Sequence, residues 1–578
     1  MTVTDVEVAV DAAGLLLTFN EAGVLDISDV HVADRICALG GEPDERVALA
    51  VALLVRALRG GSVCVDLATI AEAVGSDGLP WPEPMQWQAA VRASVLLRDP
   101  PVLHLYDERL LYLDRYWREE KQVCDDLLAL LAARRAAGAP VSERLFPPDY
   151  QEQRVAVEIA LSQGVTVLTG GPGTGKTTTV ARLLALVAEQ AELAGSAPPR
   201  IALAAPTGKA AARLAEAVQL EVARLEAADR ARLGDLQATT LHRLLGRRPD
   251  SSSRFRHDRA NRLPHDMIVV DETSMVSLTM MARLLEAVRP DTRLVLVGDA
   301  DQLASVEAGA VLADLVDGLS ARADVRVATL HTPHRFGKSI GALAEAIRLG
   351  DTEGALGLLR SGDEHIEFVE ADDATDRLRS ILMPHALRLR EAALLGAVDE
   401  ALATLDEHRL LCAHRRGPFG VRHWNRQAEM WLSEEMGLPP WSEWYAGRPL
   451  LVTANDYGLR VYNGDTGVAV AGPDGLRAVI ASSAGPLNFS TSRLSDVETM
   501  HAMTIHKSQG SQATEVTVLM PPEESRLLTR ELFYTAVTRA KAKVRVVGSE
   551  ASVRAAIGRR ALRASGLRRR LQPTAATT

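Results

Sequence analysis

A glycine-rich run between an apolar segment and a helical pattern most constrains how this chain folds. Residues 165–169 form a short, β-rich apolar segment, and residues 176–193 repeat apolar side chains at helical spacing. The run itself consists of Gly170, Gly171, Pro172, Gly173, Thr174, Gly175, Lys176, Thr177 and Thr178. A strand, a GxxxxGKT loop and a helix in this order predict a phosphate-binding loop, or P-loop.

The residue types of this loop suit a nucleoside triphosphate. Glycines let the backbone curl closely around phosphate oxygens, so that amide N–H groups and the positive end of the helix face the anion. Lys176 is expected to reach the β- and γ-phosphates, and the Thr177 hydroxyl is expected to hold magnesium. A plain glycine-rich turn is the alternative, and the lysine, the threonine and the flanking elements together disfavour it.

Length and composition bound the class of protein. At 578 residues, the chain is long enough for several domains. It has no stretch of about 18 uninterrupted apolar residues and no basic-then-apolar start, so we expect a soluble cytoplasmic protein with no membrane partner. Cys37, Cys64, Cys124 and Cys412 are scattered without a CxxC pair, which argues against zinc, iron–sulfur and disulfide sites.

Charge is segregated along the chain. The first 50 residues hold ten Asp or Glu and only Arg35 and Arg46 as basic residues. An acidic segment repels DNA phosphates, which suggests a module that contacts protein, although a solvated acidic face is equally compatible. Seven arginines and no acid lie between Arg554 and Arg570. That end could contact DNA or a partner, or form a solvated helix.

Breaks in the pattern indicate the domain organisation. Residues 136–140 and 146–148 are rich in alanine, glycine and proline, and they separate an amino-terminal part from the P-loop part. From residue 150 onward, strand and helix patterns alternate, which predicts parallel α/β layers. The strand candidates are residues 201–205, 267–270, 294–298, 409–413, 515–520 and 544–548.

Two carboxylates, Asp271 and Glu272, follow the apolar strand candidate 267–270. The carboxyl end of a strand is where an α/β sheet places its ligands. Asp271 suits a magnesium shell, and Glu272 suits orienting or deprotonating the attacking water. An Asp-Glu pair is equally compatible with an ordinary helix start when taken alone, but the complete P-loop upstream favours the catalytic interpretation.

Three further side chains are candidates to contact the γ-phosphate. Gln302 comes shortly after the strand candidate 294–298 and is interpreted as a sensor of nucleotide state. Arg335 and Arg539 are candidates to stabilise charge on the transferring phosphoryl group, a role worth about 10³–10⁵ in rate in other systems. Taken singly, each arginine more commonly forms a surface ion pair.

These motifs, in this order, resemble those of superfamily-one DNA helicases, and most closely the RecD family of subunits of the RecBCD (exodeoxyribonuclease V) complex. The resemblance spans about residues 150–548. Besides the P-loop, it uses residues 205–210, 239–246, 504–510 and 533–540. Two segments narrow it to RecD. Residues 111–117 resemble the segment before the motor, and residues 448–456 with 462–467 resemble a small SH3-like insertion.

The resemblance implies an α/β fold with two RecA-like P-loop domains on parallel sheets, a small SH3-like β insertion in the second domain, and a mainly helical N-terminal domain. The implied boundaries are 1–118 for the partner-docking domain, 119–148 for a helical connector, 149–330 and 331–578 for the motor domains, and about 440–497 for the insertion. ATP would bind in the cleft between the motor domains, and single-stranded DNA would lie across their top.

The resemblance also assigns residue roles. Gln153 would read the adenine, Lys176 and Thr177 would hold phosphate and Mg²⁺, Asp271 and Glu272 would serve metal and water, and Gln302, Arg335 and Arg539 would report the γ-phosphate. The implied DNA contacts are Pro206, Thr207, His242, Thr504, His506 and Lys507. His242 is also compatible with a satisfied helix-start histidine. Because the chain is only 4% aromatic, backbone contacts should dominate over base stacking, and binding should weaken as salt rises.

The function implied by the resemblance is an ATP-dependent 5′-to-3′ DNA helicase. It would be the motor subunit of a heterotrimer with RecB-like and RecC-like subunits, and it would act on single-stranded DNA at duplex ends during double-strand-break repair by recombination. A free-standing helicase of the same lineage and a regulatory ATPase without translocation remain alternatives. We find no second metal-binding carboxylate constellation in the sequence, so nuclease activity is expected from a partner subunit.

Overall fold

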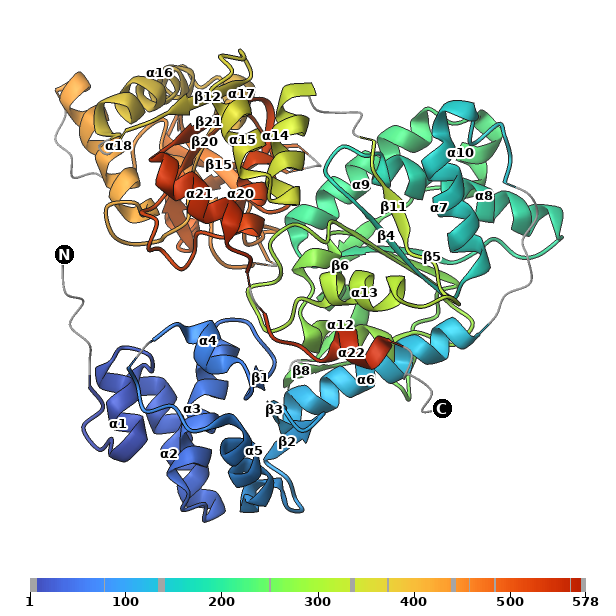
Figure 1. Ribbon diagram of the computed structural model, residues 1–578. Coiled ribbons are helices and arrows are strands. Elements are labelled where there is room, and N and C mark those ends of the chain that lie inside the picture. Colours follow the sequence, from blue (N-terminus) through green and yellow to red (C-terminus); the bar gives the residue numbers. More distant parts are fainter. Residues whose placement is uncertain are drawn as a thin grey trace.

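The computed structural model describes residues 8–76, 78–133, 141–248, 251–332, 338–371, 374–437, 443–456, 458–482, 485–561 and 563–572. Figure 1 shows three bodies: an N-terminal module in blue, a first motor module in cyan to green, and a second motor module in yellow to red. Within the described residues, no helix combines the length and apolar character needed to cross a membrane.

The N-terminal module is mainly helical, as predicted. Its helices are α1 (Gly14–Glu21), α2 (Ile27–Gly40), α3 (Glu45–Arg59), α4 (Ile70–Val74) and α5 (Pro84–Ala93). A three-stranded sheet of order β1-β3-β2 joins them, with β1 (Val65–Asp66), β2 (Leu103–Tyr106) and β3 (Leu110–Leu113). Helix α3 is central because residues 49–54 are all buried. Part of the acidic charge is neutralised internally, since the buried Asp29 accepts two hydrogen bonds from Arg59 at 2.7 and 2.6 Å.

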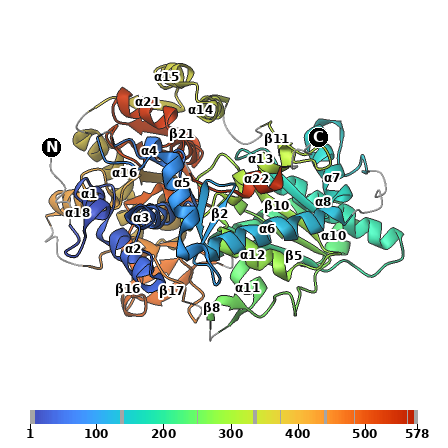
Figure 2. The same ribbon diagram turned by 60° about the horizontal axis from the view of Figure 1, so that its bottom comes forward.

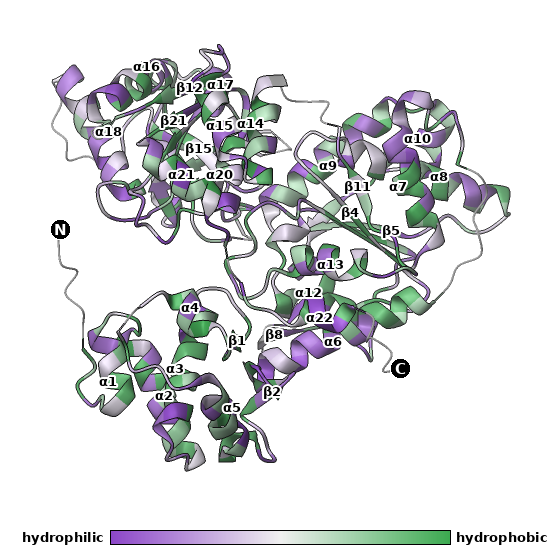
Figure 3. Ribbon diagram, viewed as in Figure 1, coloured by the Kyte–Doolittle hydropathy of each residue, from purple (hydrophilic) through white to green (hydrophobic). Residues whose placement is uncertain are grey.

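The first motor module is built on a parallel sheet of order β11-β4-β10-β9-β5-β6. Its strands are β4 (Val165–Gly170), β5 (Ile201–Ala205), β6 (Ala238–Thr240), β9 (Met267–Val270), β10 (Arg293–Gly298) and β11 (Ala328–Leu330). Strands β4 and β5 are mostly hydrophobic in Figure 3, the pattern of a sheet covered on both faces. A hairpin of β7 (Arg247–Arg248) and β8 (Ser251–Phe255) follows β6.

Alternate residues of this sheet enter two separate cores. One face, which includes Val167 of β4, packs against α6 (Asp114–Ala132), α12 (Leu278–Ala287) and α13 (Val311–Ser320). The other face, which includes Leu168, packs against α7 (Gln151–Ser162), α8 (Lys176–Leu193) and α9 (Gly208–Ala223). The shorter helices α10 (Ala227–Leu233) and α11 (Leu241–Leu245) complete the module. Helix α6 runs continuously across the predicted boundary between residues 118 and 119 because its buried face packs along α12.

The second motor module has a parallel sheet of order β12-β21-β20-β13-β19. Its strands are β12 (Ile366–Val369), β13 (His408–Cys412), β19 (Ala502–Thr504), β20 (Ala513–Leu519) and β21 (Ala540–Val547). Its helices are α14 (Lys338–Leu349), α15 (Thr352–Leu359), α16 (Thr375–Leu394), α17 (Val398–Glu407), α18 (Val421–Met436), α19 (Ile505–Ser508), α20 (Arg530–Val537) and α21 (Glu550–Gly558). The predicted pair of parallel-sheet domains is thus confirmed.

An antiparallel sheet interrupts the second module between α18 and β19. It has the order β17-β16-β15-β14-β18, with β14 (Pro449–Val452), β15 (Thr466–Gly472), β16 (Gly475–Ile480), β17 (Leu487–Ser490) and β18 (Val497–Thr499). The SH3-like character of this insertion stays a prediction. The insertion also reaches the first module, because Lys209 Nζ donates a 3.2 Å hydrogen bond to the carbonyl of Gly464.

The carboxyl-terminal segment differs from the sequence expectation that residues 331–578 all belong to the second motor domain. After α21 the chain returns to the first module, where α22 (Leu567–Leu571) packs against α13 and α6 (Figures 1 and 2). Apolar burial explains this return, since Leu567 and Leu571 are 1% and 0% exposed within the core of the first module.

The arginine-rich end contacts this chain itself. Five of its arginines pair with carboxylates: Arg554 with Glu353 and Glu550, Arg560 with Glu531 (Nε to Oε1, 3.7 Å), Arg568 with Asp317, Arg569 with Asp107, and Arg570 with Glu120. The other two donate to backbone carbonyls: Arg559 to those of Glu523 and Ser525, and Arg563 to those of Ser305, Glu307 and Gly309. Each of these seven arginines therefore has at least one partner within this chain.

The pair of Arg570 and Glu120 is the most buried of these ties. Arg570 Nε donates to Glu120 Oε1 at 2.9 Å, and the two side chains are 10% and 0% exposed. Glu120 also accepts hydrogen bonds of 3.0 Å from the Tyr112 hydroxyl, from Ser565 Oγ and from the Gly566 amide. These additional hydrogen bonds to the Glu120 carboxylate are needed because removing two charges from water costs several kcal/mol per ion.

We predict that Arg570→Ala lowers the free energy of unfolding by about 3–5 kcal/mol, because it leaves the Glu120 carboxylate buried without its cation. Arg569→Ala, at the exposed pair with Asp107, is the matched control and should change stability by less than about 1 kcal/mol. Urea unfolding followed by tryptophan fluorescence tests this. Equal effects of the two substitutions would contradict the account.

Candidate nucleotide and DNA site

The P-loop joins β4 to α8 at an interior strand of the first sheet. Gly173 and Gly175 have φ angles of 80° and 89°, a left-handed region that side chains rarely adopt, so the loop requires glycine at both positions. Lys176 Nζ donates to the carbonyls of Gly170 and Gly171 at 2.7 and 2.9 Å. Because α8 begins at Lys176, the free amides of its first turn face the loop.

Threonine hydroxyls brace the loop from within. Thr174 Oγ1 donates to the Gly171 carbonyl and Thr179 Oγ1 donates to the Gly175 carbonyl, both at 2.9 Å. Pro172, Thr177 and Thr178 are half-buried along the loop and the first turn of α8. The hydroxyl of Thr177 is therefore placed at the start of the helix, next to the phosphate-binding amides.

Asp271 and Glu272 directly follow β9, which lies between β10 and β5. The Asp271 amide donates to the Ala204 carbonyl at 2.9 Å. Glu272 has a φ of 50°, a left-handed conformation that costs of order 1–3 kcal/mol for a residue with a side chain. The sequence predicted that this pair follows a strand, but it did not predict the left-handed backbone conformation of Glu272.

The electrostatics of this pair fit a cation. Burial and the adjacent Glu272 raise the pKa of Asp271 to about 6, while Lys176 acts in the opposite direction. A divalent cation at Asp271 would relieve the repulsion between the two carboxylates. Thr177 and Asp271 offer the hard oxygen ligands that Mg²⁺ prefers, and Mg²⁺ commonly completes its shell with substrate phosphates and water.

Gln302 lies in the loop after β10 and is 7% exposed. Its Nε2 donates to Asp299 Oδ2 at 3.0 Å. Its Oε1 is buried and has no hydrogen-bond partner among the residues that the structure describes. Because a buried acceptor without a donor costs about 1–3 kcal/mol, this oxygen suits a donor that arrives during function, such as a water molecule.

Arg539 follows α20 and reaches the same region from the second module. Its Nε donates to the Thr535 carbonyl at 3.0 Å, and its Nη1 donates to the Ser511 carbonyl at 3.4 Å. Burial lowers the pKa of Arg539, and the carboxylates of Glu272 and Asp299 act against that shift. The guanidinium is therefore within electrostatic reach of two first-module carboxylates. Arg335 lies outside the described residues.

Gln153 lies at the start of α7, before the P-loop strand, and is 3% exposed. The neighbouring Glu152 accepts hydrogen bonds from the amides of His331 and Thr332 at 2.9 and 3.2 Å. These contacts fix the beginning of α7 against the chain that leaves β11. They therefore hold the start of α7, where Gln153 lies, close to the end of β11.

Threonine-capped helices stand at the carboxyl ends of strands in both motor modules. The hydroxyls of Thr207, Thr240 and Thr504 accept hydrogen bonds of 3.2 Å from the amides of Ala210, Arg243 and Lys507. Each hydroxyl keeps its own proton to donate to a phosphate oxygen. The sequence candidates omitted Thr240. Its segment Thr-Leu-His-Arg repeats the spacing of Thr-Ile-His-Lys at residues 504–507, which is the signal that identifies it.

The remaining DNA candidates lie beside these caps. Burial lowers the pKa of both His242 and His506; Glu307 opposes the shift at His242, while Arg247 and Arg563 act in the same direction as burial at His242 and His506 respectively. Lys507 Nζ donates to Glu498 at 3.1 Å. Pro206 is half-buried between β5 and Thr207. The ring of His242 also packs edge-on against Phe255, with 5.7 Å between the ring centroids, so it has a structural contact as well.

A P-loop, a carboxylate pair, a glutamine and an arginine from a second parallel-sheet module together define a two-module P-loop motor protein. Family models match residues 153–308 as an AAA domain, 499–547 as a UvrD-like helicase C-terminal domain, and 21–110 as the N-terminal domain of RecBCD enzyme subunit RecD. A RecBCD enzyme subunit RecD from Mycobacterium tuberculosis is 76% identical over 574 residues, covering 99% of this chain and 100% of the relative. The chain belongs to the family of RecBCD enzyme subunit RecD.

Further relatives extend the comparison. The RecBCD enzyme subunit RecD of Mycolicibacterium smegmatis is 70% identical over 552 residues, covering 96% of this chain and 98% of the relative. An ATP-dependent RecD2 DNA helicase from Deinococcus radiodurans is 30% identical over 464 residues, covering 78% of this chain and 57% of the relative. Among solved structures, a Bacteroides Pif1 bound to single-stranded DNA aligns with a TM-score of 0.38 at 16% identity, covering 71% of this chain and 92% of the Pif1 chain.

We predict that Arg539→Ala keeps nucleotide affinity but lowers the rate of ATP hydrolysis about 10³-fold or more, because the arginine acts on charge that develops during phosphoryl transfer. Steady-state hydrolysis and equilibrium binding of a fluorescent ADP analogue measure the two effects separately. Lys176→Ala should abolish turnover in a folded protein, and Arg554→Ala on the surface should change neither quantity. Loss of binding at an unchanged turnover number would contradict the role of Arg539.

Proposed function

We propose that this RecD-family chain is the ATP-dependent DNA helicase motor of a RecBCD-type complex and moves 5′ to 3′ on single-stranded DNA at duplex ends. In this role it serves the processing of double-strand breaks for recombinational repair. The observation that carries the proposal is the shared site: Tyr534 and Thr535, on the helix before Arg539 in the second module, form hydrogen bonds with the Asp299–Leu303 loop of the first module. Such a site couples hydrolysis to the relative position of the modules.

The residues divide the chemistry among them. Gln153 reads the adenine, Lys176 holds the β- and γ-phosphates, and Thr177 with Asp271 holds Mg²⁺, which neutralises charge on the phosphates when bound. Glu272 orients the attacking water and takes its proton, and Gln302 Oε1 accepts a hydrogen bond from the same water. Arg539 stabilises the charge that develops on the transferring group.

Translocation along DNA follows from the division of the candidate DNA-contacting residues between the two motor modules. Pro206, Thr207 and His242 belong to the first module, and Thr504, His506 and Lys507 belong to the second. Closing of the cleft on ATP and opening after hydrolysis therefore change the distance between two grips on the phosphate backbone. Contacts to phosphates carry no base information, so the grip is independent of sequence and weakens with salt.

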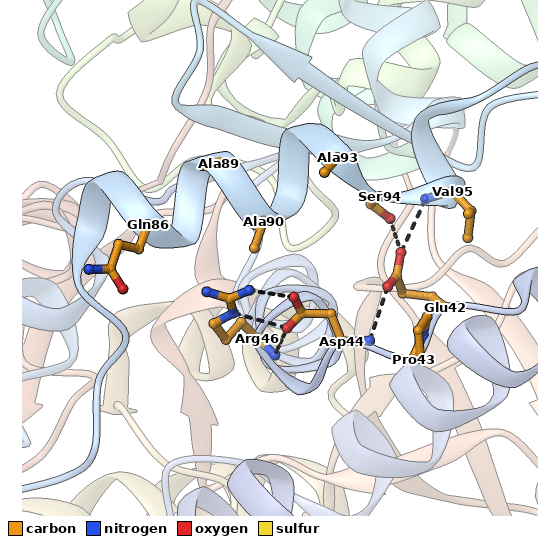
Figure 4. Close-up of a pocket in the computed structure, with 10 residues that line it drawn as sticks. All are labelled: Glu42, Pro43, Asp44, Arg46, Gln86, Ala89, Ala90, Ala93, Ser94 and Val95. Atoms are coloured by element: carbon orange, nitrogen blue, oxygen red, sulfur yellow. Dashed lines mark hydrogen bonds and ion pairs between the residues drawn. The ribbon is translucent and has the colours of Figure 1, made fainter.

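The N-terminal module offers a surface for a RecC-like subunit. Val32 and Leu39 lie seven residues apart on one face of α2 and are 42% and 73% exposed, and Met85 at the start of α5 is 77% exposed. A hollow of about 620 Å³ lies between residues 42–46, which lead into the start of α3, and α5 (Figure 4). We propose that this module, roughly residues 1–118, docks the partner and that the following connector and two motor domains transmit the contact.

Two alternative functions predict different behaviour in assays of ATP hydrolysis and DNA unwinding. A regulatory ATPase without translocation would not require single-stranded DNA to stimulate hydrolysis. A free-standing helicase would unwind DNA without partners. The 76% identity to a RecBCD enzyme subunit RecD, against 30% to the RecD2 DNA helicase, favours the complex. We assign nuclease chemistry to a partner subunit.

We predict selective unwinding of duplexes that carry a 5′ single-stranded tail. Strand displacement by the purified chain, with ATP and with Lys176→Ala as the inactive control, measures this directly. Selective unwinding of 3′-tailed duplexes would refute the proposed polarity. If neither duplex is unwound while single-stranded DNA stimulates ATP hydrolysis, the motor requires its partner subunits.

We predict that Val32→Asp together with Leu39→Asp abolishes copurification with a RecC-like subunit, because two charges would be buried in an apolar contact. ATP hydrolysis stimulated by single-stranded DNA should be unchanged. Leu193→Asp, at the exposed end of α8 in the first motor module, is the control, since Leu193 is 78% exposed. Unchanged copurification of the doubly substituted chain would reject this docking surface.

A further inference from the structure

We infer that Tyr534 is a positioning residue for ATP hydrolysis, because its hydroxyl ties the Gln302 loop of the first motor module to the helix of the second module that precedes Arg539. The inference rests on the proposed ATPase function. It concerns a side chain of the motif at residues 533–540 to which the sequence assigned no role, and which does not itself contact the reacting atoms.

One carboxylate receives hydrogen bonds from both modules. The Tyr534 hydroxyl donates to Asp299 Oδ2 at 3.1 Å, and the same oxygen accepts the 3.0 Å hydrogen bond from Gln302 Nε2. The other oxygen, Oδ1, accepts from the Asp301 amide at 3.1 Å. Tyr534 and Asp299 are each 3% exposed, so water does not compete for these contacts. Asp299 is therefore held in place by a donor from the second module.

The orientation of Asp299 decides where Gln302 points. The amide group of glutamine is planar, so a nitrogen fixed on Asp299 Oδ2 also fixes the direction of Oε1. This Oε1 is the buried acceptor that lacks a partner among the described residues, and it is the atom we assign to the attacking water. Loss of the tyrosine hydroxyl would free Asp299 to rotate and would misdirect that oxygen.

The same loop is anchored a second time further along. The Leu303 amide donates to Thr535 Oγ1 at 2.9 Å, and Gln509 Nε2 donates to the Leu303 carbonyl at 2.7 Å. The Leu303 side chain lies in the apolar core of the second module, which also contains Phe533. Thr535 is the neighbour of Tyr534 on α20, and its carbonyl accepts from Arg539. One short helix thus positions both the loop and the arginine.

Tyr534 also lies against the P-loop. A Cβ atom placed on Gly171 would lie 3.1 Å from the tyrosine hydroxyl oxygen, a contact tighter than most, so this glycine permits the approach. The Gly171 carbonyl in turn accepts the hydrogen bond from Lys176. The hydroxyl therefore sits where the phosphate-binding loop, the glutamine loop and the arginine helix meet.

The hydroxyl is suited to act as a permanent donor. Burial and the carboxylates of Asp299 and Asp301 raise the pKa of Tyr534 well above its ordinary value, while Arg348 acts in the opposite direction. The group therefore keeps its proton throughout the physiological range. A donor that never ionises gives a fixed geometry and not a pH-dependent one.

A purely structural hydroxyl would give a different result from a positioning one. Removing a structural hydrogen bond lowers stability and leaves the turnover number of the folded enzyme unchanged. Removing a positioning hydrogen bond lowers kcat while KM for ATP stays constant, because ground-state binding by the P-loop does not depend on the direction of Gln302 Oε1. The separation of kcat from KM therefore distinguishes the two roles.

The test is Tyr534→Phe in the full chain, assayed for ATP hydrolysis stimulated by single-stranded DNA. We expect kcat to fall about tenfold or more with KM for ATP within about twofold of wild type. Tyr445→Phe is the matched control. Its hydroxyl bonds to His501 at 2.9 Å elsewhere in the second module, so this change should leave kcat unaltered. Asp299→Asn should lower kcat as well, and adding Tyr534→Phe to it should cause little further loss, since both act through one contact.

The outcomes separate this inference from the proposed function. DNA-stimulated hydrolysis by the wild-type chain, abolished by Lys176→Ala, tests the proposed function itself. Tyr534→Phe with wild-type kcat and KM in that assay would overturn the role of Tyr534 and leave the function standing. A fall in kcat that simply adds to the effect of Asp299→Asn would also overturn it.

Discussion

The loop that follows β10 joins the two motor modules at the nucleotide site. It begins at Asp299, beside the P-loop strand, and ends at Leu303 in the apolar core of the second module. Close-packed interiors do not deform continuously, so a loop fixed at both ends must respond when the modules move. Gln302 lies between those two ends. Its position therefore depends on the state of the cleft, which makes the site for hydrolysis and the geometry of the motor a single unit.

The carboxyl-terminal segment adds a second tie between the modules. It leaves the second module and places Arg563 on backbone carbonyls of the first module and Arg570 on Glu120 of the connector helix. On its way it also meets the N-terminal module, where the Val63 amide donates to the Ala564 carbonyl at 2.9 Å. A partner bound to the N-terminal module therefore contacts a body that is already bonded to the carboxyl-terminal segment and, through the Gly309 amide and the Gly61 carbonyl, to the first motor module.

Local patterns were sufficient for part of this structure. The apolar run at residues 165–169 became β4, and residues 176–193 became α8, because a P-loop fixes strand, turn and helix within one stretch of chain. The link from Tyr534 to Asp299 spans 235 residues, and that from Arg570 to Glu120 spans 450 residues. Such contacts depend on how separate bodies meet, so neither periodicity nor motif spacing could predict them, and the arginine-rich end remained ambiguous until its partners were visible.

The most direct test of a site shared between moving modules is the distance between them. All four native cysteines are buried, so dyes would react selectively with Leu193→Cys in the first module and Leu395→Cys in the second, at positions that are 78% and 75% exposed. The account predicts that a non-hydrolysable ATP analogue with single-stranded DNA changes energy transfer between the dyes, and that Lys176→Ala prevents the change. An unchanged distance at saturating nucleotide, in a protein that hydrolyses ATP, would contradict it.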